Sequence, residues 1–194
     1  MNQRRLIRIA IAIVLVAALI PSVYAFMVRR SRTVENVFTP AVVDCDVEET
    51  FEDNVKSDIM VRNTGNTTAY IRVRLVFNWQ DSAGTVIARN VNNFPPVSWD
   101  TINWFKVGDT YYYRHPVEPG DLTLDLLTAN WSKDASPELH EGLIYYYYPV
   151  MEVLAEAIQA DGVIMIDGEA VPAVQDAWED VVVNKENGTI KAKG

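Results

Sequence analysis

The sequence predicts an all-β protein: an antiparallel β-sandwich with one short C-terminal helix, which follows an N-terminal signal or membrane helix. Three observations lead to this fold class. Apolar residues beyond residue 43 recur mostly at every second position, turn-forming residues separate these alternating stretches, and only one segment of the body has clear helical spacing. Strands with this spacing and few helices are typical of an antiparallel sandwich.

The chain begins with an apolar run, residues 9–27, which follows three arginines. The core of the run ends before helix-breaking Pro21, and the small residues Val23 and Ala25 have the spacing of a signal peptidase site. We therefore expect residues 1–25 to be a signal peptide, cleaved between Ala25 and Phe26. The alternative is a membrane helix retained to residue 27, because a run of 19 residues is just long enough to cross the bilayer core. Both alternatives place the body outside the cell or on its surface, exported by a Sec-type signal.

The charge of the body restricts its partners. The whole chain has a formal net charge of −9, which becomes −12 without residues 1–25, because that region holds three arginines and no acidic residue. Nucleic acid is not an expected partner, since binding to its backbone requires lysines and arginines that neutralise phosphates. The single cysteine, Cys45, allows no intramolecular disulfide. Its alternation with acidic residues predicts a buried, inert thiol, and the alternative is an intermolecular bridge.

The clearest strand covers residues 70–79. Its apolar side chains fall on one face, while Arg72, Arg74 and Asn78 fall on the other. Turn formers at residues 63–66 precede it, and a further strand is expected at 57–62, so the two predict a hairpin.

A second hairpin is predicted around Gly108 and Asp109, a pair suited to a two-residue turn between strands at 104–107 and 110–114. Leucines at 122, 124 and 126 alternate with polar residues and predict another strand.

The one convincing helix is expected over residues 169–181. Val174, Ala177, Trp178 and Val181 follow the spacing of one helical face, and Pro172 suits the first turn. Residues 150–160 are ambiguous, because their apolar residues also fit a helical stripe and their composition favours helix. The segment 184–194 is expected to be a polar tail, mobile beyond a last short strand.

Catalytic motifs are missing from the sequence. His140 and Glu141 begin an HExxH motif, but Ile144 stands where the second histidine is needed, so no zinc site forms from one helical face. No nucleophile elbow, phosphate loop or dinucleotide fingerprint is present. We therefore expect no enzymatic activity, catalytic residue, cofactor or metal. An acidic cluster between residues 44 and 53 could bind calcium, but a solvated strand face explains it better.

Tyrosines occur in two runs, 111–113 and 145–148. Because successive side chains of a strand point to opposite faces, about half of them should be buried and half exposed. The exposed tyrosines could be present only because tyrosine favours strands, or they could form a contact surface for glycans or neighbouring subunits.

Three stretches together resemble one known family, the TasA and camelysin type of exported protein of Gram-positive bacteria, which a SipW-class signal peptidase processes. These are ENVFTPAVVDCDVEE with the preceding Tyr24, Ala25 and Phe26, KSDIMVRNTGNTTAYIRVRLVFNW, and AEAIQADG followed by VQDAW. The last is similar to the biofilm-matrix and pilin-like branch that includes BsaA. One departure is the basic stretch Met27–Arg32, where the family is commonly polar or acidic.

The resemblance implies a jelly-roll-like sandwich and favours a strand at 150–160. It also implies a subunit of a fibre or matrix, in which the freed N-terminal segment adds as a strand to the next copy. Here this assembly segment would be residues 26–43, in front of a sandwich domain at 44–183. Its apolar side chains are Val34, Val37, Phe38, Ala41, Val42 and Val43.

We therefore expect a secreted structural protein that forms homopolymers, with signal peptidase and other matrix proteins as further partners. The alternative is a cell-surface adhesin that binds glycans. A third reading is a camelysin-like protease, which the missing zinc ligand does not support.

Overall fold

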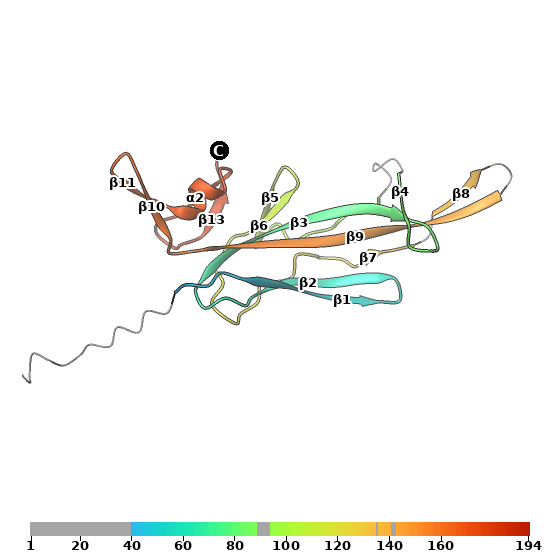
Figure 1. Ribbon diagram of the computed structural model, residues 1–194, viewed down its shortest axis with the longest axis horizontal. Helices are drawn as coiled ribbons and strands as arrows, with labels where there is room; N and C mark the ends of the chain where they lie inside the picture. Colours follow the sequence, from blue (N-terminus) through green and yellow to red (C-terminus); the bar gives the residue numbers. More distant parts are fainter. Residues whose placement is uncertain (1–39, 89–93, 135, 141–142) are drawn as a thin grey trace, which may run out of the picture. The chain divides into compact units, whose positions relative to one another are not determined.

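The computed structural model describes residues 40–88, 94–134, 136–140 and 143–194 of the chain (Figure 1). Within these ranges, residues 41–194 form one compact unit built almost entirely of antiparallel strands, which confirms the all-β class. None of the helices in the described ranges has the length and apolar character needed to cross a bilayer. The expected signal helix and the cleavage positions Ala25 and Phe26 lie outside the described residues.

Two sheets and two separate hairpins make up this unit. The smaller sheet has the order β1-β2-β7, with β1 at Cys45–Glu52, β2 at Val55–Asn63 and β7 at Trp131–Ser132. The larger has the order β5-β6-β3-β9-β8, with β5 at Trp104–Val107, β6 at Thr110–Tyr113, β3 at Ala69–Gln80, β9 at Leu143–Gln159 and β8 at Ser136–His140. The short β4, Val86–Ile87, pairs with the end of β3.

The remaining elements follow β9. They are the hairpin of β10, Val163–Ile166, and β11, Glu169–Pro172, then the helix α2, Ala173–Ala177, and the hairpin of β12, Val181–Val183, and β13, Ile190–Ala192.

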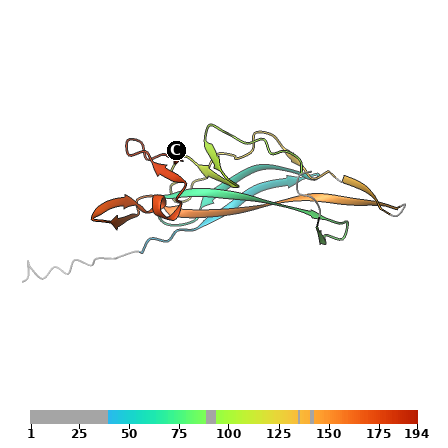
Figure 2. The same ribbon diagram turned by 90° about the horizontal axis from the view of Figure 1, so that it is seen from above.

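The first core lies between the two sheets, as in a sandwich. Figure 1 shows the β1–β2 layer below the β3–β9 layer, and the two layers overlap when seen from above (Figure 2). Ile59 and Val61 of β2 meet Ile71 and Val73 of β3, and all four are fully buried. The apolar face predicted for β3 is therefore confirmed, and Arg74 on the opposite face is exposed.

Residues 150–160 belong to a strand. Residues 148–159 of β9 pair antiparallel with the whole length of β3, from Ala69 opposite Gln159 to Gln80 opposite Tyr148. Met151 is buried and Leu154 is 53% exposed, a strand pattern that a helical stripe through Leu154 does not match. The helix-favouring composition was thus overridden by cross-strand pairing.

The first predicted hairpin is wrong, and the second is confirmed. β2 and β3 belong to different sheets, so residues 63–66 form a connection between the layers. Asn and Gly tolerate such a turn whether the flanking strands pair or separate, which is why local signals could not tell the two apart. β5 and β6 do pair across Gly108 and Asp109.

Residues 122–126 form no regular strand. They touch β2 only through an isolated bridge between Leu122 and Arg62, followed by irregular hydrogen bonds. Thr123 is buried and Leu124 is 54% exposed, the reverse of the predicted pattern, whereas Leu126 is fully buried as predicted. The hydroxyl of Thr123 is buried because it accepts a hydrogen bond from the Val61 N–H at 3.0 Å.

A second core lies on the outer face of the larger sheet, where the C-terminal elements cover it. Val174, Trp178 and Val181 are buried as predicted, but Ala177, placed on the same face, is exposed, and α2 is only five residues long. Residues 169–172 pair with β10 as a strand instead of opening the helix. Ile190 is also buried and β13 pairs with β12, so most of the expected polar tail is part of the fold.

All three tyrosines of β6 are buried, which corrects the expected alternation of buried and exposed. Tyr111 and Tyr113 face the first core, and Tyr112 faces the second. β6 therefore has apolar cover on both faces, and Tyr112 stacks on Phe105 with ring centroids 5.1 Å apart.

Candidate assembly surface

The N-terminal segment enters the folded body at a defined point. The Val42 N–H donates to the Asn66 side chain at 2.7 Å, and the Asn66 N–H donates back to the Val42 carbonyl at 2.9 Å. Thr64 and Gly65 donate backbone hydrogen bonds to the Asp44 carbonyl at 3.1 and 3.3 Å. The turn at 63–66 thus holds residues 42–44 against the body.

The glycine of this turn is required by close approach. A Cβ built on Gly65 would lie 2.3 Å from the Val42 carbonyl oxygen, so any side chain would displace the incoming segment. Asn63, fully buried, stabilises the same turn: its amide donates to the carbonyls of Thr67 and Val117, and its side-chain oxygen accepts from Gly65. The sequence predicts a turn at residues 63–66, but not its role as an anchor, because that role depends on contacts with residues 42–44.

The structure describes only some of the residues expected to take part in assembly. Ala41, Val42 and Val43 are exposed, yet the backbone at 42 is fastened to its own chain. Val34, Val37 and Phe38 lie outside the described residues. An assembly segment compatible with this anchor ends before residue 41.

The larger sheet has an incomplete strand ladder along β9. This strand pairs with β3 over residues 148–159, but β8 covers its other side only at residues 143–147. Among the described residues, no strand pairs with that second side of β9 from 148 to 159. Unpaired strand edges are templates for strands of other chains.

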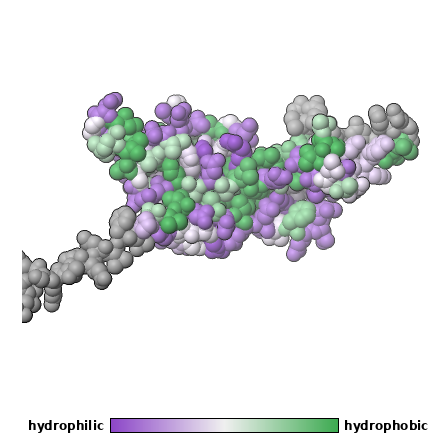
Figure 3. Space-filling model, viewed as in Figure 1, coloured by the Kyte–Doolittle hydropathy of each residue, from purple (hydrophilic) through white to green (hydrophobic). Residues whose placement is uncertain are grey.

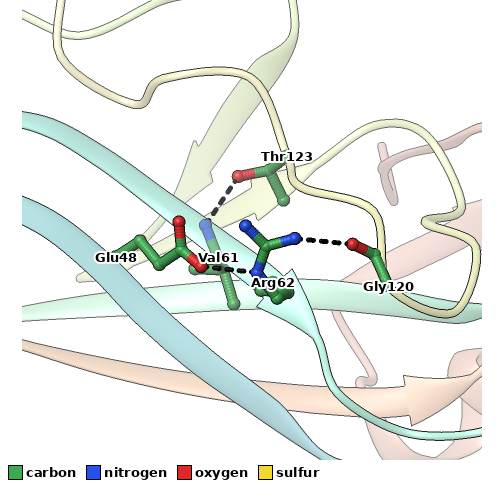
Figure 4. Close-up of polar contacts among 5 residues, drawn as sticks. All are labelled: Glu48, Val61, Arg62, Gly120 and Thr123. Carbon is green, nitrogen blue, oxygen red and sulfur yellow. Dashed lines mark hydrogen bonds and ion pairs between the residues drawn. The ribbon is translucent and has the colours of Figure 1, made fainter.

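Within the described ranges, the smaller sheet has no strand paired with the outer side of β1. The opposite edge, on the far side of β2, is closed by residues 120–126 and β7. The Arg62 side chain pairs with Glu48 and donates a hydrogen bond to the Gly120 carbonyl at 2.7 Å (Figure 4). The Thr123 hydroxyl accepts a hydrogen bond from the Val61 N–H. The backbone of Thr123 and Leu126 also donates to Val61 and Ile59. The hydrogen bond from Arg62 lowers the pKa of Glu48.

A cavity of about 280 Å³ lies where β1 and β9 come close to each other. Its apolar lining comes from Phe51, Trp131, Val150 and Met151, and its charged lining from Glu49, Lys56 and Lys133. Lys56 is only 6% exposed; its ammonium donates to Glu49 Oε2 at 2.8 Å and to the Met151 carbonyl at 2.7 Å. This second contact ties β2 of one sheet to β9 of the other.

Two further apolar surfaces lie near opposite ends of β9 (Figure 3). Leu143 and Ile144, where β9 begins, are each 61% exposed, and Tyr146 is 53% exposed. In the β10–β11 hairpin, Val163 and Met165 are 65% and 69% exposed. Side chains of this kind gathered on a surface are typical of protein interfaces.

The other predicted positions have ordinary structural surroundings. Cys45 is half-buried against the first core, and its pKa is raised to about 11 by desolvation and by Asp44 and Asp46. In the acidic cluster, Glu48 pairs with Arg62 and Glu49 with Lys56. No group of three or more potential metal ligands occurs in the part of the chain that the structure describes.

Comparison with protein-family models, curated proteins and solved structures gives no significant match to this chain. The resemblance to the TasA and camelysin type therefore stands on the residues quoted for it.

Proposed function

We propose that this protein is a secreted, non-enzymatic subunit of an extracellular fibre or biofilm matrix. In this proposal, the N-terminal segment of one copy, up to residue 40, adds as a strand to the open edge of β9 or β1 in the next copy. The single observation that carries it is the incomplete ladder on β9, which has one strand partner along residues 148–159 among the described residues. A jelly-roll-like connection of the strands is part of the same proposal.

The anchor at residues 42–44 supports this arrangement. Because the turn at 63–66 holds these residues, the chain before them starts from a defined point on the body. A strand that leaves one copy and joins the next makes a contact between different surfaces, and such contacts build open filaments unless the rotation between copies closes a ring. Filaments of one repeated subunit are the expected product.

Electron microscopy of the exported form tests the proposal against a variant lacking residues 26–39, which keeps the anchor. The parent protein should form filaments and the deletion variant should remain dispersed. Val37→Asn should weaken assembly because it removes an apolar contact, and Thr33→Asn is the matched polar control. Equal filament formation by the parent and the deletion variant would falsify the role of this segment.

One observation favours the adhesin as a second candidate. Tyr146 is exposed at the start of β9, whereas the tyrosines at 111–113 are buried. A glycan bound through tyrosine would therefore contact Tyr146. A glycan array probed with the parent protein and with Tyr146→Ala tests this, and absence of binding by the parent protein removes the candidate.

A further inference from the structure

The cavity between β1 and β9 contains a lysine whose contacts are incomplete. An ammonium group has three N–H donors, and the described residues supply two acceptors to Lys56, which are Glu49 and the Met151 carbonyl. This nearly buried cation can therefore donate one further hydrogen bond, to an acceptor that enters the cavity.

The charges around this cavity favour an anion. Lys56 and Lys133 line it together with one carboxylate, Glu49, so the lining carries a formal charge of +1 in a chain of net charge −9. Lys133 lies over the ring of Phe51, 5.9 Å from its centroid, at the same cavity. A carboxylate attached to an apolar segment matches both the cations and the walls.

The assembly segment contains one such group. Residues 26–43 hold a single acidic residue, Glu35, which follows Val34 and is separated from Val37 by Asn36. The cavity lies beside the open stretch of β9, because Val150 and Met151 line it and belong to residues 148–159. We propose that this cavity binds the Glu35 carboxylate of a second copy and thereby sets the register at which its N-terminal segment adds to β9. The inference rests on the proposed function.

The charge pattern on the two strands assigns a direction to this addition. On the segment, the three arginines precede Glu35, and the apolar residues Val37 and Phe38 follow it closely. On β9, the glutamates follow Met151, and Val150 and Tyr148 precede it. Antiparallel addition centred on Glu35 and Met151 therefore places unlike charges together and apolar residues together. The groups concerned are Arg29, Arg30, Arg32, Val37 and Phe38 on the segment, and Glu152, Glu156, Val150 and Tyr148 on β9.

A register determinant is needed physically. A slip of one residue moves every side chain of a strand to the other face, and an apolar segment alone specifies its register weakly. A carboxylate that must reach a buried ammonium has one favourable position, because in slipped registers the incoming carboxylate loses this donor while Lys56 keeps Glu49 as its partner.

The test compares the critical concentration for filament formation among variants of the exported protein. Glu35→Gln should raise it about tenfold or more, the effect of losing one charge-assisted hydrogen bond. The exchange Glu35→Asn with Asn36→Glu keeps the composition but moves the carboxylate to the opposite strand face, and it should raise the critical concentration as much. Lys133→Glu should have a similar effect, and Glu35→Lys combined with Lys133→Glu should restore part of the assembly. Lys185→Gln, at an exposed site beyond β12, is the control.

Two results separate this inference from the proposal beneath it. If Glu35→Gln and the exchange variant assemble at the parental concentration while deletion of residues 26–39 prevents assembly, the register role of Glu35 is overturned and strand addition stands. If the deletion variant also assembles, both are overturned. A carbodiimide crosslink between Glu35 of one copy and Lys133 of another, identified by mass spectrometry in filaments, is the expected direct result.

Discussion

Two tyrosine runs in this chain have opposite environments. Tyr111, Tyr112 and Tyr113 of β6 are all at most 7% exposed, whereas Tyr145 and Tyr146 of β9 are 43% and 53% exposed. Both runs lie in strands, so the difference does not come from local conformation. It comes from the number of layers that cover each strand.

β6 lies between two cores, with the smaller sheet on one face and the C-terminal elements on the other. The start of β9 extends past the end of β3, and its strand partner there is β8. An amphipathic side chain such as tyrosine is compatible with both situations. The comparison shows that a tyrosine run by itself predicts a strand but not an exposed binding surface.

The largest expected effect is on stability at β6. Tyr112→Ala should lower the free energy of unfolding by about 3–5 kcal/mol, because it leaves a cavity beside Phe105 and Trp178. Denaturant titration measures this, with Tyr112→Phe as a control that keeps the ring. A loss below about 1 kcal/mol for the alanine variant would mean that the outer face of β6 is not a core.

The next largest effect is expected in amide hydrogen exchange, which should be slow in β6 and fast at the start of β9. The amides of Tyr111 and Tyr112 lie in a strand paired on both sides, so they should exchange only through global unfolding. Amides at residues 143–146 belong to a two-stranded extension and should exchange at least about a hundredfold faster. Similar protection in both strands would show that the start of β9 is covered in solution.

Cys45 gives an intermediate case, because it is half-buried. Its pKa is raised from 9.0 to about 11, so at pH 8 the thiolate should be about a hundredfold scarcer than for a free cysteine. Alkylation by iodoacetamide should be slower by a similar factor, and labelling at the rate of a free cysteine would contradict this.

The same shift predicts a pH dependence of stability. The folded state favours the neutral thiol, so its contribution is complete below pH 9 and is lost as the pH rises from 9 through about 11. Cys45→Ser should remove this part of the alkaline destabilisation. An unchanged pH profile of the unfolding midpoint would assign the loss to other groups.

The smallest effect on stability is expected at the start of β9. Tyr146→Ala should change the free energy of unfolding by less than about 0.5 kcal/mol, because the side chain is 53% exposed. Light scattering of the same variant then measures whether this surface contributes to association. A loss as large as that of Tyr112→Ala would remove the contrast between the two runs.

The sequence predicted much of the fold where one strand face is buried and the other is exposed. The alternation in β3 and the turn at Gly108 and Asp109 are local signals, and the structure confirms both. The burial of Val174, Trp178 and Val181 was predicted as well, although the predicted helix at 169–181 is longer than α2. Its first residues are a strand because β10 pairs with them, a contact that no local pattern reveals.

The candidate site was less predictable. The apolar character of residues 26–43 and the turn at 63–66 can be read from the chain, but the use of that turn as an anchor for Val42 depends on a contact between residues 24 positions apart. Lysine is a residue type that usually lies on the surface, so the sequence alone does not predict that Lys56 is buried. It is buried because Glu49 and the Met151 carbonyl supply its acceptors, and the second of these belongs to the other sheet.

The sequence by itself determined the β-rich class, the acidic body, the absence of catalytic motifs and the positions of several strands and turns, because these depend on neighbouring residues. Only the tertiary structure decided which strands pair, which faces are covered twice and which edges stay open. Strand pairing joins residues far apart in the chain, and local periodicity states which side chains favour burial without stating what covers them. The incomplete ladder on β9, on which the proposed function depends, is therefore a property of the fold.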